Sequence, residues 1–233
     1  MADSRTLVAG SSATTAERVS AFLTKVYGWM FIGLGITAGI AYVVASSPAL
    51  TAALMANRLV FFALVLVELG LVFFLSARVH SLQPGTAAAL FVGYAALNGV
   101  TLSLILLIYT GASIAMTFVV TGAMFGALAV YGTTTSRSLA GVGQFFFMGL
   151  IGLVLASIVG MFWHSDALQF LITIVGVIVF TGLTAWDAQR LKQMALTLPD
   201  GQAGAYAVVG ALSLYLNFVN LFLMLLRLQG RRD

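Results

Sequence analysis

Seven long apolar segments, separated by short connections, take up most of this 233-residue chain. About 20 consecutive apolar residues are enough to cross the hydrocarbon core of a bilayer as an α-helix. Within the bilayer the backbone must satisfy its own hydrogen bonds, which favours helices for such segments. We therefore predict an all-α membrane protein, folded as a bundle of seven transmembrane helices. The segments comprise residues 27–45, 59–77, 87–109, 113–131, 144–163, 168–186 and 205–226.

The composition agrees with a membrane protein and leaves no length for a separate soluble domain. Hydrophobic residues make up 61% of the chain, charged residues make up 8%, and the mean hydropathy is +1.07. Soluble domains contain about 25% charged residues. The sequence has no cysteine, which excludes disulfides and thiolate metal sites. Its formal charge of +4 comes without a dense basic run, so we expect no nucleic-acid partner.

The first 20 residues are polar, rich in Ser, Thr and Ala, and contain no apolar stretch of the signal-peptide type. We expect residues 1–20 to form a disordered tail and residues 21–233 to form the transmembrane domain. The first helix would then act as an uncleaved signal anchor. A bundle of six spans is the alternative, and it would need a re-entrant hairpin at residues 110–112 or 164–167.

The distribution of Lys and Arg predicts how the bundle is oriented, because cytoplasmic loops carry an excess of these residues. With seven spans, one side carries Arg5, Arg18, Lys25, Arg78, Arg137, Arg190 and Lys192. The other side carries Arg58, Arg227, Arg231 and Arg232. We expect a cytoplasmic N-terminus and an external C-terminus, although the arginines after the last segment oppose this orientation.

Two carboxylates, Glu68 and Asp187, stand within or at the edge of apolar segments. A charge at bilayer depth costs at least about 2.5 kcal/mol, so such residues usually face the bundle interior and mark ion or proton paths. Structural roles are the alternative. Glu68 could be protonated or held in an internal ion pair, although Arg78 is about 15 Å farther along the same helix. Asp187 could pair with Arg190 at the membrane surface if the sixth helix ends at Trp186.

Polar residues also recur at helical spacing within two segments. They are Tyr94, Asn98 and Thr101 in the third segment, and Ser213, Asn217 and Asn220 in the seventh. Residues three and four apart share one helix face, and a polar face in lipid must turn inward. These faces would either hydrogen-bond between helices as structural contacts or line a hydrated pathway.

Glycine pairs at a spacing of four occur in the first and fourth segments, as Gly35 with Gly39 and Gly122 with Gly126. Small residues let helices approach closely in lipid, where hydrophobicity does not drive association. We interpret these pairs as internal contacts of a monomeric bundle and keep a dimer face as the alternative.

The sequence offers little support for an enzyme. His80 and His164 fall in different loops on opposite predicted sides, so a paired zinc site is not expected. The sequence contains no G-x-S-x-G, P-loop or H-E-x-x-H motif. We expect no catalytic residues and no cofactor.

Three segments resemble the transmembrane Bax inhibitor motif family, and its bacterial members most closely. They are GVTLSLILLIYTGASIAMTFVVTGAMFGALAVYG from Gly99, GVIVFTGLTAWDAQRLK from Gly176 and GALSLYLNFVNLFLMLLR from Gly210. The resemblance runs from about Phe22 to the end of the chain. It implies a seven-helix bundle with a central seventh helix, and a calcium leak whose opening depends on pH.

The resemblance also implies site residues. In the family, carboxylates of the sixth and seventh helices form a proton-sensing pair, and a glutamate and an arginine of the second helix serve the pore and its latch. Asp187 matches the sixth-helix aspartate, Glu68 matches the glutamate, and Arg78 falls next to the arginine position. Asn217 stands where family members commonly have the second aspartate, in LYLNF rather than LYLDF.

This departure changes the expected response to pH. An aspartate that faces an asparagine lacks the like-charge repulsion of two paired carboxylates, although it can accept a hydrogen bond from the amide. Our hypothesis is that the protein keeps the bundle but has a shifted or flattened pH response.

The favoured function is therefore a calcium leak of a bacterial inner membrane. Asp187 and Glu68 would bind calcium weakly, since calcium accepts carboxylate and amide oxygens. Asn98, Asn217, Asn220 and Ser213 would line the path. The expected partners are the bilayer and calcium ions. Two alternatives remain: a regulatory membrane protein that binds a quality-control protease through its N-terminal tail, and a cation/proton exchanger.

Overall fold

A computed structural model describes residues 3–163, 165–199 and 202–231, except for the side chains of residues 3–14, 58 and 161. The described chain is helical, with short connections and no strand. The elements are α1 (Asp3–Ala45), α2 (Pro48–Ala56), α3 (Arg58–Arg78), α4 (Pro84–Leu102), the 3-10 helix η1 (Ser103–Leu107), α5 (Gly111–Thr134), α6 (Ala140–Phe162), α7 (Asp166–Thr197) and α8 (Ala203–Gln229).

Seven helices in the described part of the chain are long and apolar enough to cross a membrane. They are α1, α3, α4 continued by η1, α5, α6, α7 and α8, which confirms the predicted bundle of seven. The helix α2 was not expected, because nine residues are too short to span a bilayer. The side chain of Ser47 caps its start, accepting a hydrogen bond from the amide of Leu50.

Two predicted segment ends differ from the structure. The sixth predicted segment continues past Trp186, because α7 ends at Thr197. The first begins earlier than expected, because the apolar part of α1 extends over Thr15–Ala45. The predicted domain boundary at residue 20 falls within α1. The side chains of residues 3–14 lie outside the described part, and the expected tail stays a prediction.

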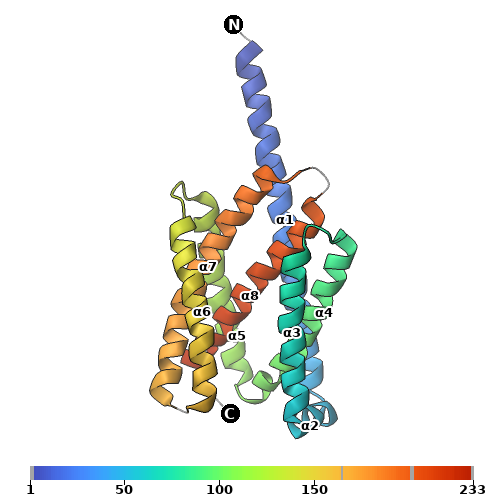
Figure 1. Ribbon diagram of the computed structural model, residues 1–233, viewed down its shortest axis with the longest axis vertical. Helices are drawn as coiled ribbons and strands as arrows, with labels where there is room; N and C mark the ends of the chain where they lie inside the picture. The colour runs from blue at the N-terminus through green and yellow to red at the C-terminus, as the bar shows by residue number, and fades with distance from the viewer. Residues whose placement is uncertain (1–2, 164, 200–201, 232–233) are drawn as a thin grey trace.

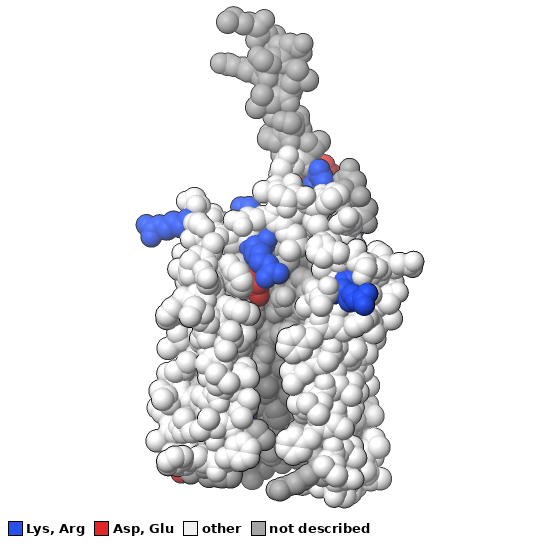
Figure 2. Space-filling view, viewed as in Figure 1, with Lys and Arg blue, Asp and Glu red and all other residues white. Residues whose placement is uncertain are grey.

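Consecutive spanning helices run antiparallel, so the two ends of the chain lie at opposite ends of the bundle (Figure 1). α1 extends beyond the other helices at one end (Figure 1). On the face that Figure 2 shows, the described Lys and Arg side chains gather toward that same end. Arg78 at the last turn of α3 and Arg137 between α5 and α6 belong to this end.

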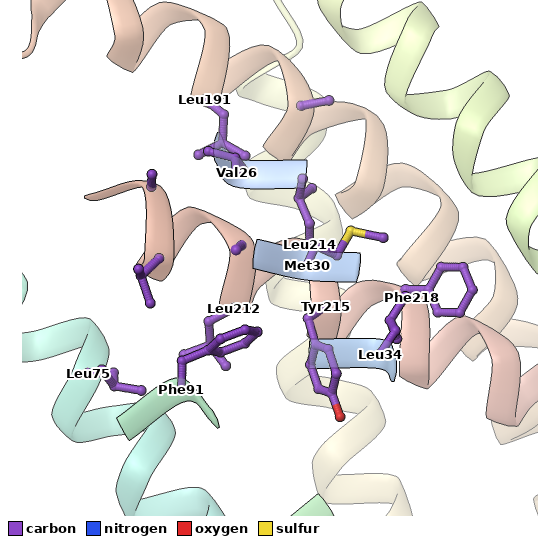
Figure 3. Close-up of a cluster of buried hydrophobic side chains, with 14 of the residues drawn as sticks. Val26, Met30, Leu34, Leu75, Phe91, Leu191, Leu212, Leu214, Tyr215 and Phe218 are labelled. Carbon is purple, nitrogen blue, oxygen red and sulfur yellow. The ribbon is translucent and has the colours of Figure 1, made fainter. Parts of the chain in front are cut away.

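The core forms where α8 meets its neighbours. α8 packs against α7, α1, α5 and α4 and makes a smaller contact with α3. Of its most apolar stretch, 61% is buried, against 6% for α3 and 11% for α6, so α3 and α6 have most of their surface outward. Figure 3 shows side chains from α1, α3, α4, α7 and α8 converging, and Met30 of α1, Phe91 of α4 and Tyr215 of α8 belong to this one buried apolar cluster.

Glycines do permit close helix contacts, but at other positions than the sequence pairs indicated. A Cβ on Gly132 of α5 would lie 2.1 Å from the carbonyl oxygen of Ala185 on α7. Built on Gly35, Gly39, Gly122 or Gly126, a Cβ would meet nothing within 4 Å. The interpretation of these two pairs as internal contacts is therefore wrong.

Candidate functional site

Asp187 lies inside α7, with 8% of its surface exposed. Its Oδ2 accepts a hydrogen bond from Nδ2 of Asn217 on α8, at 2.8 Å. Nη1 of Arg190 lies 3.7 Å from Oδ1, and the Arg190 side chain is 48% exposed. The alternative of a carboxylate exposed at the end of a helix is thus wrong, although the expected pairing with Arg190 is present. A buried carboxylate is held between an amide on one side and a half-exposed guanidinium on the other.

A cavity of about 270 Å³ opens beside this carboxylate, between α6, α7 and α8. One water occupies about 30 Å³ in the liquid, so the space can hold several waters. Its polar lining consists of Asp187, Arg190, Ser213, Asn217 and Asn220. The apolar lining consists of Phe147, Leu150, Phe180, Leu183, Trp186 and Leu216. The predicted polar face of the seventh segment therefore lines a cavity together with Asp187. We refer to it as the Asp187 cavity.

Two residues of the Asp187 cavity have further contacts that fix their positions. Nδ2 of Asn220 donates to the carbonyl of Leu216 at 2.8 Å, so the amide oxygen points elsewhere. The guanidinium of Arg190 lies 5.5 Å from the ring centre of Trp186, in a cation–π contact. The indole in turn packs on Gly143 of α6, where a Cβ would lie 2.2 Å from the ring. Arg190 is thus placed over the carboxylate by packing as well as by charge.

Glu68 occupies a second polar cluster, between α3 and α4, with 9% of its surface exposed. Its Oε2 accepts a hydrogen bond from Nδ2 of Asn98 at 3.2 Å, and its Oε1 accepts one from Oγ1 of Thr101 at 2.9 Å. The predicted polar face of the third segment is therefore directed at Glu68. Because both carboxylate oxygens of Glu68 already accept a hydrogen bond, Glu68 does not need an arginine to satisfy them.

The Glu68 cluster continues through α8 to α1. The hydroxyl of Tyr215 donates to Oδ1 of Asn98 at 2.9 Å and lies 2.6 Å from Oγ1 of Thr37. Thr37 Oγ1 also donates to the carbonyl of Ala95, at 2.8 Å. Two hydroxyl hydrogens thus serve three contacts, so the hydrogen positions can alternate. The cluster joins four helices through polar contacts in an otherwise apolar core.

Sequence reasoning did not find Thr37 or Tyr215 as members of this cluster. Thr37 is the one threonine in the apolar segment 27–45, which contains no serine, and this rarity was the available signal. Tyr215 lies two residues before Asn217, within the LYLNF motif. The contact between Thr37 and Tyr215 joins residues 178 positions apart, which no local pattern reveals.

The structure places the two carboxylates in separate clusters on α3 and α7, without a shared hydrogen-bond partner. α8 contributes to both, with Tyr215 in one and Asn217 in the other. Arg78 is exposed at the last turn of α3 and belongs to neither cluster, so its role as a latch stays a prediction. Within the described residues, no group of three or more His, Cys, Asp or Glu side chains is arranged to hold a metal ion.

The fold and the two clusters define a polytopic membrane protein with buried carboxylates in its helical core. Residues 19–233 match the family model described as "Inhibitor of apoptosis-promoting Bax1". The chain belongs to this family, which confirms the resemblance to Bax inhibitor proteins.

Several bacterial proteins are similar over most of the chain. Inner membrane protein YbhL of Escherichia coli K12 is 49% identical over 214 residues, covering 91% of this chain and 92% of that protein. An uncharacterized protein of Borreliella burgdorferi is 46% identical, with coverage of 91% and 92%. Another uncharacterized protein, from Deinococcus radiodurans, is 40% identical over the full length of both chains.

Proposed function

We propose that this protein is a calcium (cation) leak channel whose flux is controlled by carboxylates inside the bundle. The observation that carries the proposal is the Asp187 cavity, a polar space at a buried carboxylate between membrane-spanning helices. Hydrated polar cavities at such depth are expected along ion paths, because lipid offers charged groups no partners. No catalysed reaction and no cofactor form part of this proposal.

Asp187 would bind the passing ion weakly and would respond to protons. Carboxylate and amide oxygens suit calcium, and a single carboxylate favours release over storage. Ser213, Asn217 and Asn220 would supply neutral oxygens along α8, which we propose as the central helix of the path. Glu68 would act from its own cluster on α3. This cluster also reaches α8, because Asn98 bonds both Glu68 and the Tyr215 hydroxyl.

The direct test is calcium influx into liposomes that contain the purified protein, measured from pH 6 to pH 8. We expect Asp187→Asn to abolish or flatten the pH dependence, because it removes the titrating group from the cavity. Glu68→Gln should lower flux less, since the amide keeps an oxygen that accepts from Nδ2 of Asn98 and an NH2 group that can donate to the hydroxyl oxygen of Thr101. Flux of the unaltered protein equal to that of empty liposomes would overturn the proposal.

We propose a bacterial inner membrane as its location, with a cytoplasmic N-terminus. The E. coli relative is named as an inner membrane protein. The gathering of Lys and Arg at the end of the bundle where α1 begins supports this orientation, because basic residues favour the cytoplasmic side (Figure 2).

A regulatory membrane protein is the second candidate, and the extension of α1 beyond the other helices favours it (Figure 1). Such a protein would engage a membrane protease through this segment. Removal of residues 1–14 leaves the apolar part of α1 from Thr15 onward intact. A leak should survive this truncation, whereas a regulator acting through the tail should lose its effect in cells.

A cation/proton exchanger would use the same carboxylates. It is distinguished by obligate counter-transport: calcium entry would then move protons out in a fixed ratio, and an outward proton gradient would drive calcium in against the calcium gradient. A leak would continue to pass calcium down its own gradient.

A further inference from the structure

A long groove lies along one face of α1, outside both carboxylate clusters. Its first part has a volume of about 1110 Å³ and lies between α1 and the ends of α5 and α7. Hydroxyls of Thr15, Ser20 and Thr24 line the side formed by α1. Thr133 of α5 and Lys192 of α7 line the other side. Apolar side chains such as Leu23, Phe31 and Leu196 form most of the remaining lining, so this part of the groove is an apolar surface with hydroxyls and one positive charge.

A second cavity, of about 250 Å³, lies farther along α1, between α1, η1, α5 and α8. Its lining is apolar apart from Thr37, whose hydroxyl is already bonded to Ala95 and Tyr215, and the Tyr42 hydroxyl. Phe118 of α5 and Phe218 and Phe222 of α8 form much of the wall. The two spaces thus differ in chemistry, since only the first carries a positive charge and a row of hydroxyls beside its apolar lining.

Both spaces lie on the same face of α1. Their lining residues on this helix follow one another at intervals of three and four from Ala16 through Ser20, Thr24, Tyr27, Phe31, Leu34, Ala38 and Ala41. This interval places them in one stripe along the helix. A helix rises about 1.5 Å per residue, so the stripe is about 38 Å long. A single elongated molecule can therefore reach from one space into the other.

The membrane fixes which end of the groove is polar. The membrane-spanning stretch Thr15–Ala45 has 31 residues, more than the about 20 that cross the hydrocarbon core. Its charged residues, Glu17, Arg18 and Lys25, lie toward the start of the stretch, so the hydrocarbon core begins after Lys25 and Leu34 to Tyr42 lie at the depth of acyl chains. Thr15 to Thr24 lie beyond it, at the depth of lipid headgroups. An amphiphile with a charged head and an apolar tail matches this order, whereas a second protein helix would need an apolar face throughout.

We propose that this groove binds one anionic phospholipid, with its phosphate at Lys192 and an acyl chain in the apolar cavity beside Phe218. Nζ of Lys192 donates one hydrogen to the carbonyl of Thr133 at 2.6 Å, which fixes the ammonium at the rim of the groove. An ammonium carries three such donors, so Lys192 can hold this bond and still donate to a phosphate oxygen. The inference is independent of the proposed calcium leak.

The test is native mass spectrometry of the full-length protein with phosphatidylglycerol or phosphatidylcholine of equal chain length. We expect the protein to retain one phosphatidylglycerol in preference to phosphatidylcholine. Lys192→Gln should reduce this preference about fivefold, the effect of one basic residue near an anionic lipid. Lys25→Gln is the matched control, because Lys25 is exposed on α1 but does not line the groove. The control should keep the preference.

A second pair of variants tests the wall of the groove on α1 without touching Lys192. A Cβ meets nothing within 4 Å at Gly28 or at Gly35, so either position accepts a side chain without a clash in the protein. Gly28 lines the groove and Gly35 does not. Gly28→Leu should therefore displace the lipid and Gly35→Leu should not.

Equal retention of the two lipids by the unaltered protein would overturn the proposal. So would equal effects within either pair of variants. The protein could instead be a dimer that Gly28→Leu dissociates and that added phosphatidylglycerol leaves intact. This result would show that a second copy occupies the groove, and it would also overturn the proposal.

Discussion

At the scale of single residues, Asn217 stands where the family resemblance implies the second carboxylate of a pair. Asn217 donates a hydrogen bond to Asp187, a contact that an ionised aspartate at this position could not make. Two carboxylates at this distance cannot both ionise at low cost and would release their protons in two coupled steps. With asparagine at position 217, Asp187 is the one carboxyl group among the residues that line the cavity, so the proposed response to pH would involve a single proton.

Asn217→Asp should accordingly steepen the dependence of calcium flux on pH between pH 6 and pH 8. Asn220→Asp is the matched control, because Asn220 lines the same cavity but bonds the Leu216 carbonyl instead of Asp187. Both variants add the same charge, so only direct pairing with Asp187 separates them. Identical curves for the two variants, or no change in either, would contradict this explanation of the substitution.

Tyr215 allows a second prediction at this scale, on stability. Tyr215→Phe removes the hydroxyl that contacts Asn98 and Thr37 inside the core. Interhelical hydrogen bonds in membrane proteins contribute about 0.6 kcal/mol on average and up to about 1.7. We expect a loss of about 1 kcal/mol in the free energy of unfolding, measured by denaturant titration in detergent. Tyr131→Phe, at an exposed position of α5, should cause no loss, and an equal loss in both variants would exclude a role of the cluster in stability.

At the scale of helices, the sequence predicts which segments form spans but not where they end or which way they face. The continuation of α7 past Trp186 illustrates the limit. The stretch after it contains Asp187, Arg190 and Lys192, which end an apolar run, yet Ala188, Leu191 and Ala195 remain buried against the bundle. Packing on one face maintains this helix, and a hydropathy average over all faces does not detect it.

The glycines show the same limit and give a prediction for helix packing. The spacing of Gly122 and Gly126 matches that of a contact motif, but only the tertiary structure shows that these glycines have open space and Gly132 does not. Gly132→Ala should lower the free energy of unfolding by about 1–3 kcal/mol, because the new methyl group overlaps the backbone of α7. Gly126→Ala on the same helix should be neutral or slightly stabilising, since alanine favours helix. Equal effects of the two variants on thermal unfolding would show that α5 and α7 move apart at no cost to make room for the new methyl group.

The candidate site was predictable only in part, because the sequence shows the polar residues of each segment but not which segments meet. Buried carboxylates and polar faces are visible in an apolar sequence, so Glu68, Asp187, Asn98 and Asn217 could be selected in advance. Their grouping into two clusters depends on contacts between distant segments. Thr37 and Tyr215 give only weak local signals, and a sequence does not show whether two carboxylates share one cavity.

At the scale of the whole molecule, seven spans place the termini on opposite sides of the membrane, and charge decides which side is which. The end where α1 begins carries the basic residues visible in Figure 2, whereas Arg227 in the last turn of α8 belongs to the other end. We predict that a periplasmic reporter enzyme fused after Gln229 is active. The same enzyme fused after Leu198, between α7 and α8, should be inactive, because this connection lies at the opposite end of the bundle. Activity of the Leu198 fusion alone would invert the orientation, and it would then move the Asp187 cavity and the basic end of the α1 groove to the external side.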